Sequence, residues 1–337
     1  MLLEANPFAN SSGERTLGDG IRLLHFRVRL PSCRARLVAM SENASPSVTP
    51  LFAAHERRFD ANRFVYPVLS RRARGLSLGV NLNPDKVCNF DCIYCQVDRT
   101  MAAETRFVEM PRLLAELDAA LALAKSGEIF DLPKFRDTPG ALRCVNDIAF
   151  SGDGEPTTYR NFDEIIAECA GLKRKHGLDD VKMVLITNAS MFHRPAVERG
   201  LKLLDENQGE VWAKLDAGTE EYFRLVDRTT IPFRQVLDNI AAAARARPIV
   251  IQSLFMRVAG EAPSDAEVEA FCDRLNEIVA SGGRIKLVQV YTVARRPAES
   301  YVLPLADTEV DALADRVRRE TGLVAEAFYG GTTWMSE

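Results

Sequence analysis

The sequence has no apolar run that approaches the roughly 20 residues needed for a membrane-spanning helix. Its N-terminus lacks the apolar core of a secretory signal peptide, and its seven cysteines are an odd number. Reduced thiols of this kind are typical of the cytoplasm. We therefore expect a cytoplasmic protein with no membrane partner.

An excess of basic residues is also missing. The 337 residues carry a net charge of −4, with a sequence pI of about 5.8. The chain as a whole therefore has no electrostatic footprint for nucleic acid or for an anionic membrane. A local basic patch is still compatible with this balance, so RNA stays open as a partner.

The length and the 47% of hydrophobic residues allow a large core. One large domain with extensions fits this length better than two equal domains. We predict a disordered N-terminal extension over residues 1–60, a core domain over 61–300, and a C-terminal extension of one helix and one strand over 301–337.

Residues 1–39 differ from the rest of the chain. They contain six arginines and sustain neither a helical nor a strand period. Met40 then opens a polar stretch typical of a disordered start. We interpret Met40 as the true initiator and residues 1–39 as no part of the native protein; the alternative is a basic arm that binds an acidic partner.

Three cysteines, Cys88, Cys92 and Cys95, have the spacing C-x3-C-x2-C. Three thiolates cannot close a tetrahedral zinc site, but they can hold three irons of a four-iron cluster and leave the fourth iron open. The alternatives are a zinc or redox site with a fourth ligand nearby, or three unpaired structural thiols. The nearest other cysteine is Cys144, and no histidine occurs between residues 56 and 175, so we favour the cluster.

Helical and strand-like patterns alternate along most of the chain. The patterns predict strands at residues 76–82, 147–150, 182–187, 210–215, 249–255 and 284–291, and helices at 110–125, 162–175, 195–206, 233–247 and 265–281. Six β-α units with right-handed crossovers form a curved parallel sheet. The predicted fold class is α/β, a partial (β/α)6 TIM-like barrel, followed by a helix at 304–320 and a strand at 323–328.

Period-two alternation assigns a face to each side chain of the first and fourth predicted strands. Ser77, Gly79 and Asn81 should line the barrel interior, with the large leucines and valines between them under the helices. By the same argument Lys214 and Asp216 should point inward. They are either a buried ion pair or, near the barrel mouth, contacts for a ligand.

Polar residues follow several predicted strands at the C-terminal mouth, where parallel barrels build their active sites. A glycine-rich turn at residues 151–156 lets a ligand approach the backbone; its alternative is an ordinary tight turn. Thr187 and Asn188 end the third strand, as ligand contacts or as a helix N-cap. Arg295 and Arg296 after the sixth strand could clamp an anion, or could be solvated.

Three arginines precede the first predicted strand: Arg71, Arg72 and Arg74. They could bind an anionic substrate or a phosphate. An arginine cluster is more often an ion-paired or solvated face, and we favour that interpretation here.

The cysteine spacing, with the aromatic Tyr94 just before the third cysteine, resembles the signature of the radical S-adenosylmethionine (SAM) superfamily. The resemblance implies a [4Fe-4S] cluster on Cys88, Cys92 and Cys95, whose open iron binds SAM, and one-electron cleavage of SAM to a 5'-deoxyadenosyl radical. It also implies a reducing partner such as flavodoxin or ferredoxin. Residues 152–155 resemble the family's Gly-Gly-Glu motif, with Asp153 in place of a glycine.

The resulting candidates for the SAM site are Tyr94, Gly152, Asp153, Gly154, Glu155, Thr187, Asn188, Lys214 and Asp216. The segments before the cysteines, after the second strand and after the sixth strand are together similar to wyosine-related proteins, whose studied members act on transfer RNA. Those members carry a second cysteine-held cluster upstream, where this chain has only Cys33. The substrate is therefore left unassigned.

Three functions follow as hypotheses. The first is an enzyme that cleaves SAM reductively and abstracts hydrogen from an unknown substrate. The second is an iron-sulfur protein that senses oxygen or redox state without turnover. The third is an RNA-modifying radical SAM enzyme whose arginines contact phosphates.

Overall fold

The computed structural model of the chain describes residues 59–99, 102–103 and 105–330. The predictions for residues 1–58, including a start at Met40, lie outside these residues. Among the described residues no helix is both long enough and apolar enough to cross a membrane.

A curled sheet of eight strands forms the centre of the molecule, in the order β1-β2-β3-β4-β5-β6-β8-β10. Its six central strands are all parallel, as the alternating sequence pattern predicts. These strands are β2 (Gly75–Val80), β3 (Val145–Phe150), β4 (Lys182–Thr187), β5 (Gly209–Lys214), β6 (Ile249–Leu254) and β8 (Ile285–Tyr291).

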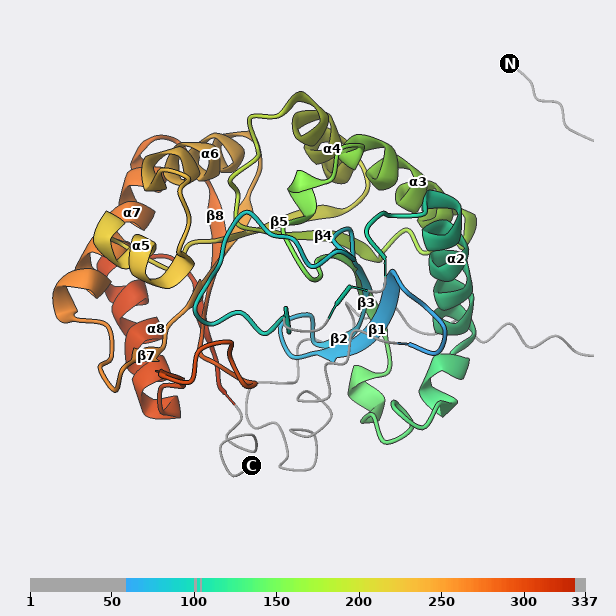
Figure 1. Cartoon of the computed structure of the whole chain (residues 1–337), viewed down its shortest axis with the longest axis horizontal. Helices are drawn as coiled ribbons and strands as arrows, with labels where there is room; N and C mark the ends of the chain where they lie inside the picture. Colours follow the sequence, from blue (N-terminus) through green and yellow to red (C-terminus); the bar gives the residue numbers. More distant parts are fainter. Residues whose placement is uncertain (1–58, 100–101, 104, 331–337) are drawn as a thin grey trace, which may run out of the picture.

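Helices cover the outer, convex face of the sheet, and the sheet curls around an interior that is open on one side (Figure 1). The helices of this layer are α2 (Met110–Ser126), α3 (Phe162–Lys175), α4 (Pro195–Asp205), α6 (Phe233–Ala246), α7 (Asp265–Ala280) and α8 (Asp307–Thr321). The main hydrophobic core lies between the two layers, where it buries residues such as Leu78, Ile148 and Leu185. The prediction of a partial barrel is confirmed.

The C-terminal strand is also as predicted: β10 (Ala325–Phe328) pairs in parallel with β8 and extends the sheet by one strand. Four of the α-helices and β-strands were not predicted. They are the antiparallel strand β1 (Val65–Ser70), the short helix α5 (Glu220–Asp227), and the two-residue strands β7 (Arg257–Val258) and β9 (Val302–Leu303).

The missed strand β1 contains Pro67, which has no N–H to donate to a neighbour. A proline within a strand is tolerated at the edge of a sheet, and β1 is an edge strand. Helix α5 has only eight residues, too few for a helical period to show clearly in the sequence. Its start is fixed by the Thr219 side chain, which accepts a hydrogen bond from the backbone N–H of Tyr222.

The face assignment along β2 holds in the structure. Leu76, Leu78 and Val80 are buried in the core under the helices, whereas Ser77 and Gly79 line the barrel interior. On β5 the same alternation turns Trp212 and Lys214 inward.

The turn between β1 and β2 contacts the C-terminal segment across the open side of the barrel. Arg74 forms an ion pair with Glu326 of β10 at 3.0 Å, and Arg71 donates a hydrogen bond to the carbonyl oxygen of Tyr329. Two arginines of the predicted cluster are therefore engaged by the chain itself, in line with the ion-paired interpretation.

Candidate active site

The cysteine loop leaves the end of β2 and crosses the barrel mouth. Backbone hydrogen bonds fix its second half on two sides: Ile93 N–H donates to Val226 of α5 at 2.9 Å, and the Cys95 carbonyl accepts from Ala298 at 2.8 Å. Ile93 is fully buried. The loop is therefore a packed part of the structure, held on one side by a helix that the sequence did not reveal.

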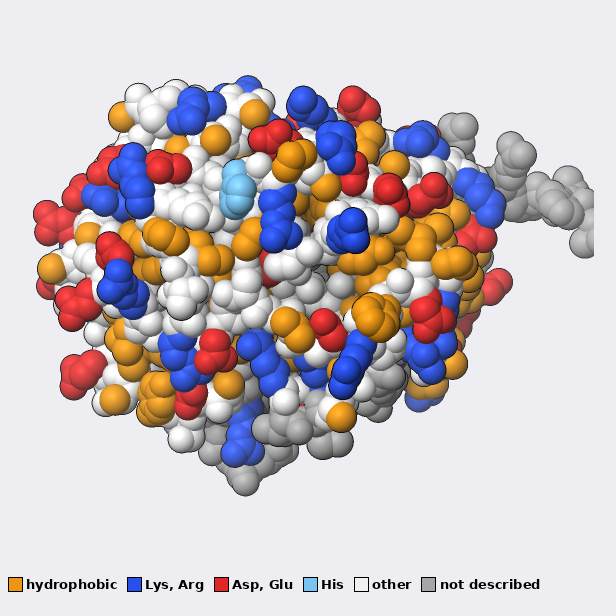
Figure 2. Space-filling view, turned by 45° about the horizontal axis from the view of Figure 1, so that its top comes forward, with side chains coloured by type: hydrophobic (Ala, Val, Ile, Leu, Met, Phe, Trp, Pro, Cys, Tyr) orange, Lys and Arg blue, Asp and Glu red, His pale blue; other side chains and the backbone are white. Residues whose placement is uncertain are grey.

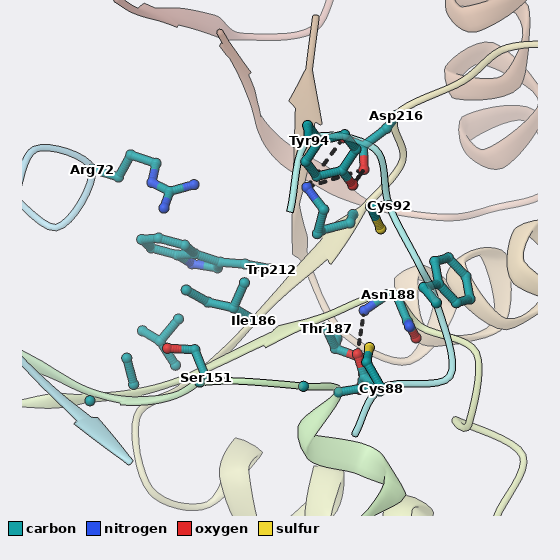
Figure 3. A pocket seen from close by; sticks show the side chains of 18 of the residues that line it. Arg72, Cys88, Cys92, Tyr94, Ser151, Ile186, Thr187, Asn188, Trp212 and Asp216 are labelled. Carbon is teal, nitrogen blue, oxygen red and sulfur yellow. Dashed lines mark hydrogen bonds and ion pairs between the residues drawn. The ribbon is translucent and has the colours of Figure 1, made fainter. Parts of the chain in front are cut away.

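A cavity of about 240 Å³ opens below this loop and is lined by Cys88, Cys92 and Tyr94. An adjoining cavity shares these three residues and adds Cys95. In the close view, Cys88 lies beside Thr187 and Asn188, and Cys92 lies beside Tyr94 and Asp216 (Figure 3). Apart from Cys95 and Asp153, which line the adjoining cavity, every residue predicted for the cluster or for SAM lines the first cavity, whereas Arg296 lines neither.

Cys92 and Tyr94 belong to a buried acidic network. The Tyr94 hydroxyl donates to Asp216 at 2.5 Å and lies 3.2 Å from Asp227. The Cys92 thiol donates to Asp227 at 3.3 Å. Burial, and then the Asp227 carboxylate, hold the pKa of Cys92 well above its ordinary value. Burial likewise raises the pKa of Cys88.

Lys214 balances part of this acidic charge. Its ammonium lies 3.1 Å from Asp216 and 2.7 Å from the Tyr291 hydroxyl. Burial by itself would lower the pKa of Lys214, but the Asp216 carboxylate and the Tyr291 hydroxyl together outweigh burial, so the pKa is raised. Lys214 and Asp216 thus form an ion pair, as one of the two interpretations predicts. The pair also faces the cavity, where the other interpretation places contacts for a ligand.

The turn after β3 lies against the loop that follows β2. A Cβ atom on Gly152 would collide with Asn81, and one on Gly154 would collide with the backbone carbonyl of Val87. The Asn81 amide donates to Asp153 at 2.7 Å. This contact gives Asp153 a structural function at the position where the family motif has glycine.

Glu155 is 3% exposed, and both of its carboxylate oxygens are engaged by the chain. One oxygen accepts from Thr157 and from the Thr187 hydroxyl at 2.6 Å. The other accepts from the backbone N–H of Asn188 at 2.7 Å. The Glu155 side chain therefore ties the end of β3 to the end of β4, and burial raises its pKa against these hydrogen bonds.

Asn188 continues this chain of contacts toward the cysteines. Its side-chain amide donates to Asn89 at 2.9 Å, and the Asn89 amide donates to Ser190 at 2.7 Å. The ends of β3 and β4 and the cysteine loop therefore form one polar scaffold.

Cys88, Cys92 and Cys95 all line one cavity, an arrangement that is compatible with a multi-iron cluster. Within the described ranges, no three His, Cys, Asp or Glu side chains come close enough together to hold one metal ion. A zinc ion needs its ligands within about 2.3 Å of one point, whereas the ligands of a four-iron cube bind separate irons. The cysteines share a cavity that has room for such a group, and Arg99 lies 3.7 Å from the Cys95 sulfur as a compensating cation.

Asp227 is the site residue that the sequence analysis missed. It is the last residue of α5, is 3% exposed, and contacts both Cys92 and Tyr94. Arg228, which ends the helix with a positive φ of 43°, is not a glycine, so the sequence carries no helix-stop signal there. Nothing in the sequence places that turn beneath the cysteine loop.

Fold and site together define an open parallel α/β barrel with a cysteine loop across its mouth. A sequence model of the Radical SAM superfamily matches residues 82–275, more than half of the chain. The chain therefore belongs to the radical SAM superfamily, whose members hold a [4Fe-4S] cluster and SAM.

Individual relatives match over shorter parts of their own sequences. A UPF0026 protein of Helicobacter pylori is 32% identical over 177 residues, which are 52% of this chain and 48% of that protein. A protein of Brachyspira hyodysenteriae named GTPase Obg is 25% identical over 261 residues, which are 75% of this chain and 33% of that protein. The chain thus spans about half the length of these curated relatives, or less.

Among solved structures, the crystal structure of archaeal TYW1 is similar at a TM-score of 0.38 and 13% identity. The match covers 74% of this chain and 73% of that one.

Proposed function

We propose that this protein is an enzyme that cleaves SAM reductively and uses the resulting radical on a small substrate held inside the barrel. A [4Fe-4S] cluster in such a site supplies the electron that converts SAM to methionine and a 5'-deoxyadenosyl radical. Superfamily membership supports the cofactors. The observation that carries the enzymatic function is the cavity that continues from Cys88 and Cys92 into the barrel interior.

Cys88, Cys92 and Cys95 would hold the cluster in this proposal. Ile93 and Tyr94 anchor the loop between the cysteines, which fixes the thiols relative to the barrel. Gly152 and Gly154 line the same cavity, where their backbone would meet the amino group of SAM, and their lack of side chains lets this turn pack against Asn81 and Val87. Glu155 contributes by positioning this turn, since its oxygens already accept hydrogen bonds from the chain.

Lys214 and Asp216 face the same cavity from β5 and can orient the ribose or the carboxylate of SAM. The barrel walls would surround a bound substrate, so that a radical meets one C–H bond of that substrate. The electron donor in this proposal is an external protein such as flavodoxin or ferredoxin.

The alternative of a sensor without turnover has less support, because a sensor has no need of a chamber beyond its cluster. The RNA-modifying alternative has less support, since Arg71 and Arg74 are engaged with the C-terminal segment of the chain. On the face shown in Figure 2, Lys and Arg side chains are interspersed with Asp and Glu.

Anaerobic reconstitution with iron and sulfide, followed by dithionite and SAM, tests the proposal. We expect 5'-deoxyadenosine from the native chain and none from Cys92→Ala, which should also bind less iron. Cys144→Ala is the matched control, because Cys144 is also half-buried but lines neither cavity. A cluster that forms and never cleaves SAM would establish the sensor instead.

A further inference from the structure

The inner part of the cavity is a chamber formed by the inward faces of β1 to β5. Its walls are mainly apolar and aromatic, with Val68, Val184, Ile186 and Trp212 among the lining residues. In the close view, Trp212 and Ile186 lie at the end away from Cys88 and Cys92, and Arg72 lies next to Trp212 (Figure 3). The chamber is therefore distinct from the mouth, where the cysteines are.

Arg72 enters this chamber from the β1–β2 turn. Its guanidinium carbon lies 4.9 Å from the centre of the Tyr291 ring, so the guanidinium is packed on an aromatic ring. Stacking uses the face of the guanidinium and leaves the N–H groups at its edge free to donate. Among the described residues, Arg72 has neither an ion-pair partner nor a hydrogen-bond acceptor.

Asp147 of β3 supplies the opposite charge. It is 3% exposed, lines the same cavity, and accepts a hydrogen bond from Ser77 on one carboxylate oxygen. Within the described part of the chain, its second oxygen has no partner. Arg72 acts on Asp147 electrostatically, yet the two form no ion pair, and both line the same cavity.

The other charges at this end of the barrel are paired. Glu210 binds Lys182 at 2.6 Å and Lys286 at 2.7 Å, and it accepts from the Trp212 indole at 3.0 Å. Arg72 and Asp147 therefore stand apart as a cation and an anion that face one apolar chamber without pairing.

We propose that the chamber binds a substrate with the chemistry of an amino acid: an anionic group on Arg72, an ammonium or N–H donor on Asp147, and an apolar or flat body against Trp212. An arginine edge accepts a carboxylate in bidentate form, and a buried carboxylate oxygen without a donor favours a cationic or N–H group. This inference rests on the proposed function, because the substrate would lie in the chamber next to the SAM site.

The test is calorimetry on the anaerobically reconstituted full chain with saturating SAM. The probes are L-phenylalanine, 3-phenylpropionate, which lacks the amino group, and 2-phenylethylamine, which lacks the carboxylate. The variant Arg72→Met should weaken phenylalanine and phenylpropionate roughly 10- to 100-fold and leave phenylethylamine unchanged. Asp147→Asn should weaken phenylalanine and phenylethylamine by a similar factor and spare phenylpropionate.

Arg74→Met is the matched control, because Arg74 lies in the same turn and pairs with Glu326 outside the chamber. Its three affinities should equal those of the native chain. The inference would be overturned if phenylalanine did not bind, or if SAM displaced it. It would also be overturned if each variant lost affinity equally for all three probes. Tight RNA binding that Arg72→Met abolishes would also overturn it.

The proposed function is measured separately, by 5'-deoxyadenosine in the same preparations. If the chain does not cleave SAM but the probe affinities change as expected, the enzymatic function is rejected and the amino-acid site is retained. If the chain cleaves SAM but the probe affinities do not change as expected, the enzymatic function is retained and the amino-acid site is rejected.

Discussion

At the scale of single residues, close backbone packing shapes the mouth of the barrel. Gly79 lies under the ring of Tyr66, and a Cβ there would collide with that ring. The Tyr66 hydroxyl can thus cross β2 and donate to the Ser151 carbonyl at 3.0 Å. Gly152 and Gly154 let the turn after β3 approach the cysteine loop in the same way.

The variant Gly154→Ala should therefore be damaging. The added methyl group meets the backbone carbonyl of Val87, next to Cys88, and a backbone atom cannot move aside as a flexible side chain can. We expect a loss of about 1–3 kcal/mol in the free energy of unfolding and a lower iron content after reconstitution. Chemical denaturation and iron analysis measure the two effects.

Gly171→Ala is the control for that variant. Gly171 lies within α3, and a Cβ there meets nothing within 4 Å. This substitution should be neutral or stabilise the helix by up to about 1 kcal/mol. Equal stabilities of the two alanine variants would contradict the packing argument.

At the scale of elements, Glu116 of α2 holds the start of β1. Its carboxylate accepts the backbone N–H groups of Arg63, Phe64 and Val65, between 2.8 and 3.1 Å. It also accepts from Arg112 at 2.9 Å. An edge strand that contains a proline is thereby fixed to the first outer helix.

Replacing Glu116 by alanine should cost about 3 kcal/mol or more in the free energy of unfolding, because several buried N–H groups lose their acceptor at once. Glu116→Gln, which keeps one acceptor oxygen, should cost less. Urea denaturation measures both variants.

Glu109→Ala controls for the loss of a glutamate near the same strand. Glu109 pairs with Arg63 at 3.5 Å on the surface, and exposed pairs of this kind contribute about 0–1 kcal/mol. A Glu116→Ala variant as stable as Glu109→Ala would refute the proposed anchoring of β1.

The elements themselves were largely predictable from the sequence. Six strands and their helices follow from alternation and from helical periods, and α3 and β4 occur at the predicted residues. The exceptions were β1, which contains Pro67, and α5, which is too short for a period. Both elements line or support the site, so their contribution came only from the structure.

At the scale of the whole molecule, the β1–β2 turn and the C-terminal segment contact each other across the open side of the partial barrel, through the Arg74–Glu326 ion pair and the Arg71 hydrogen bond to Tyr329. Inside the barrel, the buried Asp147 makes stability depend on pH. Burial raises its pKa from 3.8 to about 6, while Ser77, Lys182 and Arg72 act in the opposite direction and Glu210 adds to the rise.

This shift predicts a loss of stability as pH rises. The folded state holds the Asp147 proton more tightly than the unfolded state does, so its contribution favours folding at about pH 4 and below and is lost between about pH 4 and pH 6. The change approaches about 3 kcal/mol at 1.36 kcal/mol per pKa unit. Urea denaturation of the native chain and Asp147→Asn between pH 4.5 and 7 measures it.

The Asn variant should gain stability relative to the native chain across that range, because it has no proton to lose. Since both chains share every other titrating group, the difference between their profiles isolates Asp147. Parallel profiles would show that Asp147 is solvated or paired in solution.

The sequence by itself determined the α/β pattern, the three-cysteine loop and the inward face of β5, because each depends on the local period or spacing of neighbouring residues. Only the tertiary structure decided that Asp227 lies beneath Cys92, that Glu155 joins two strand ends, and that Arg72 enters the barrel while Arg71 and Arg74 bind the C-terminal segment. These outcomes depend on contacts between residues far apart in the chain, and no local pattern encodes such contacts.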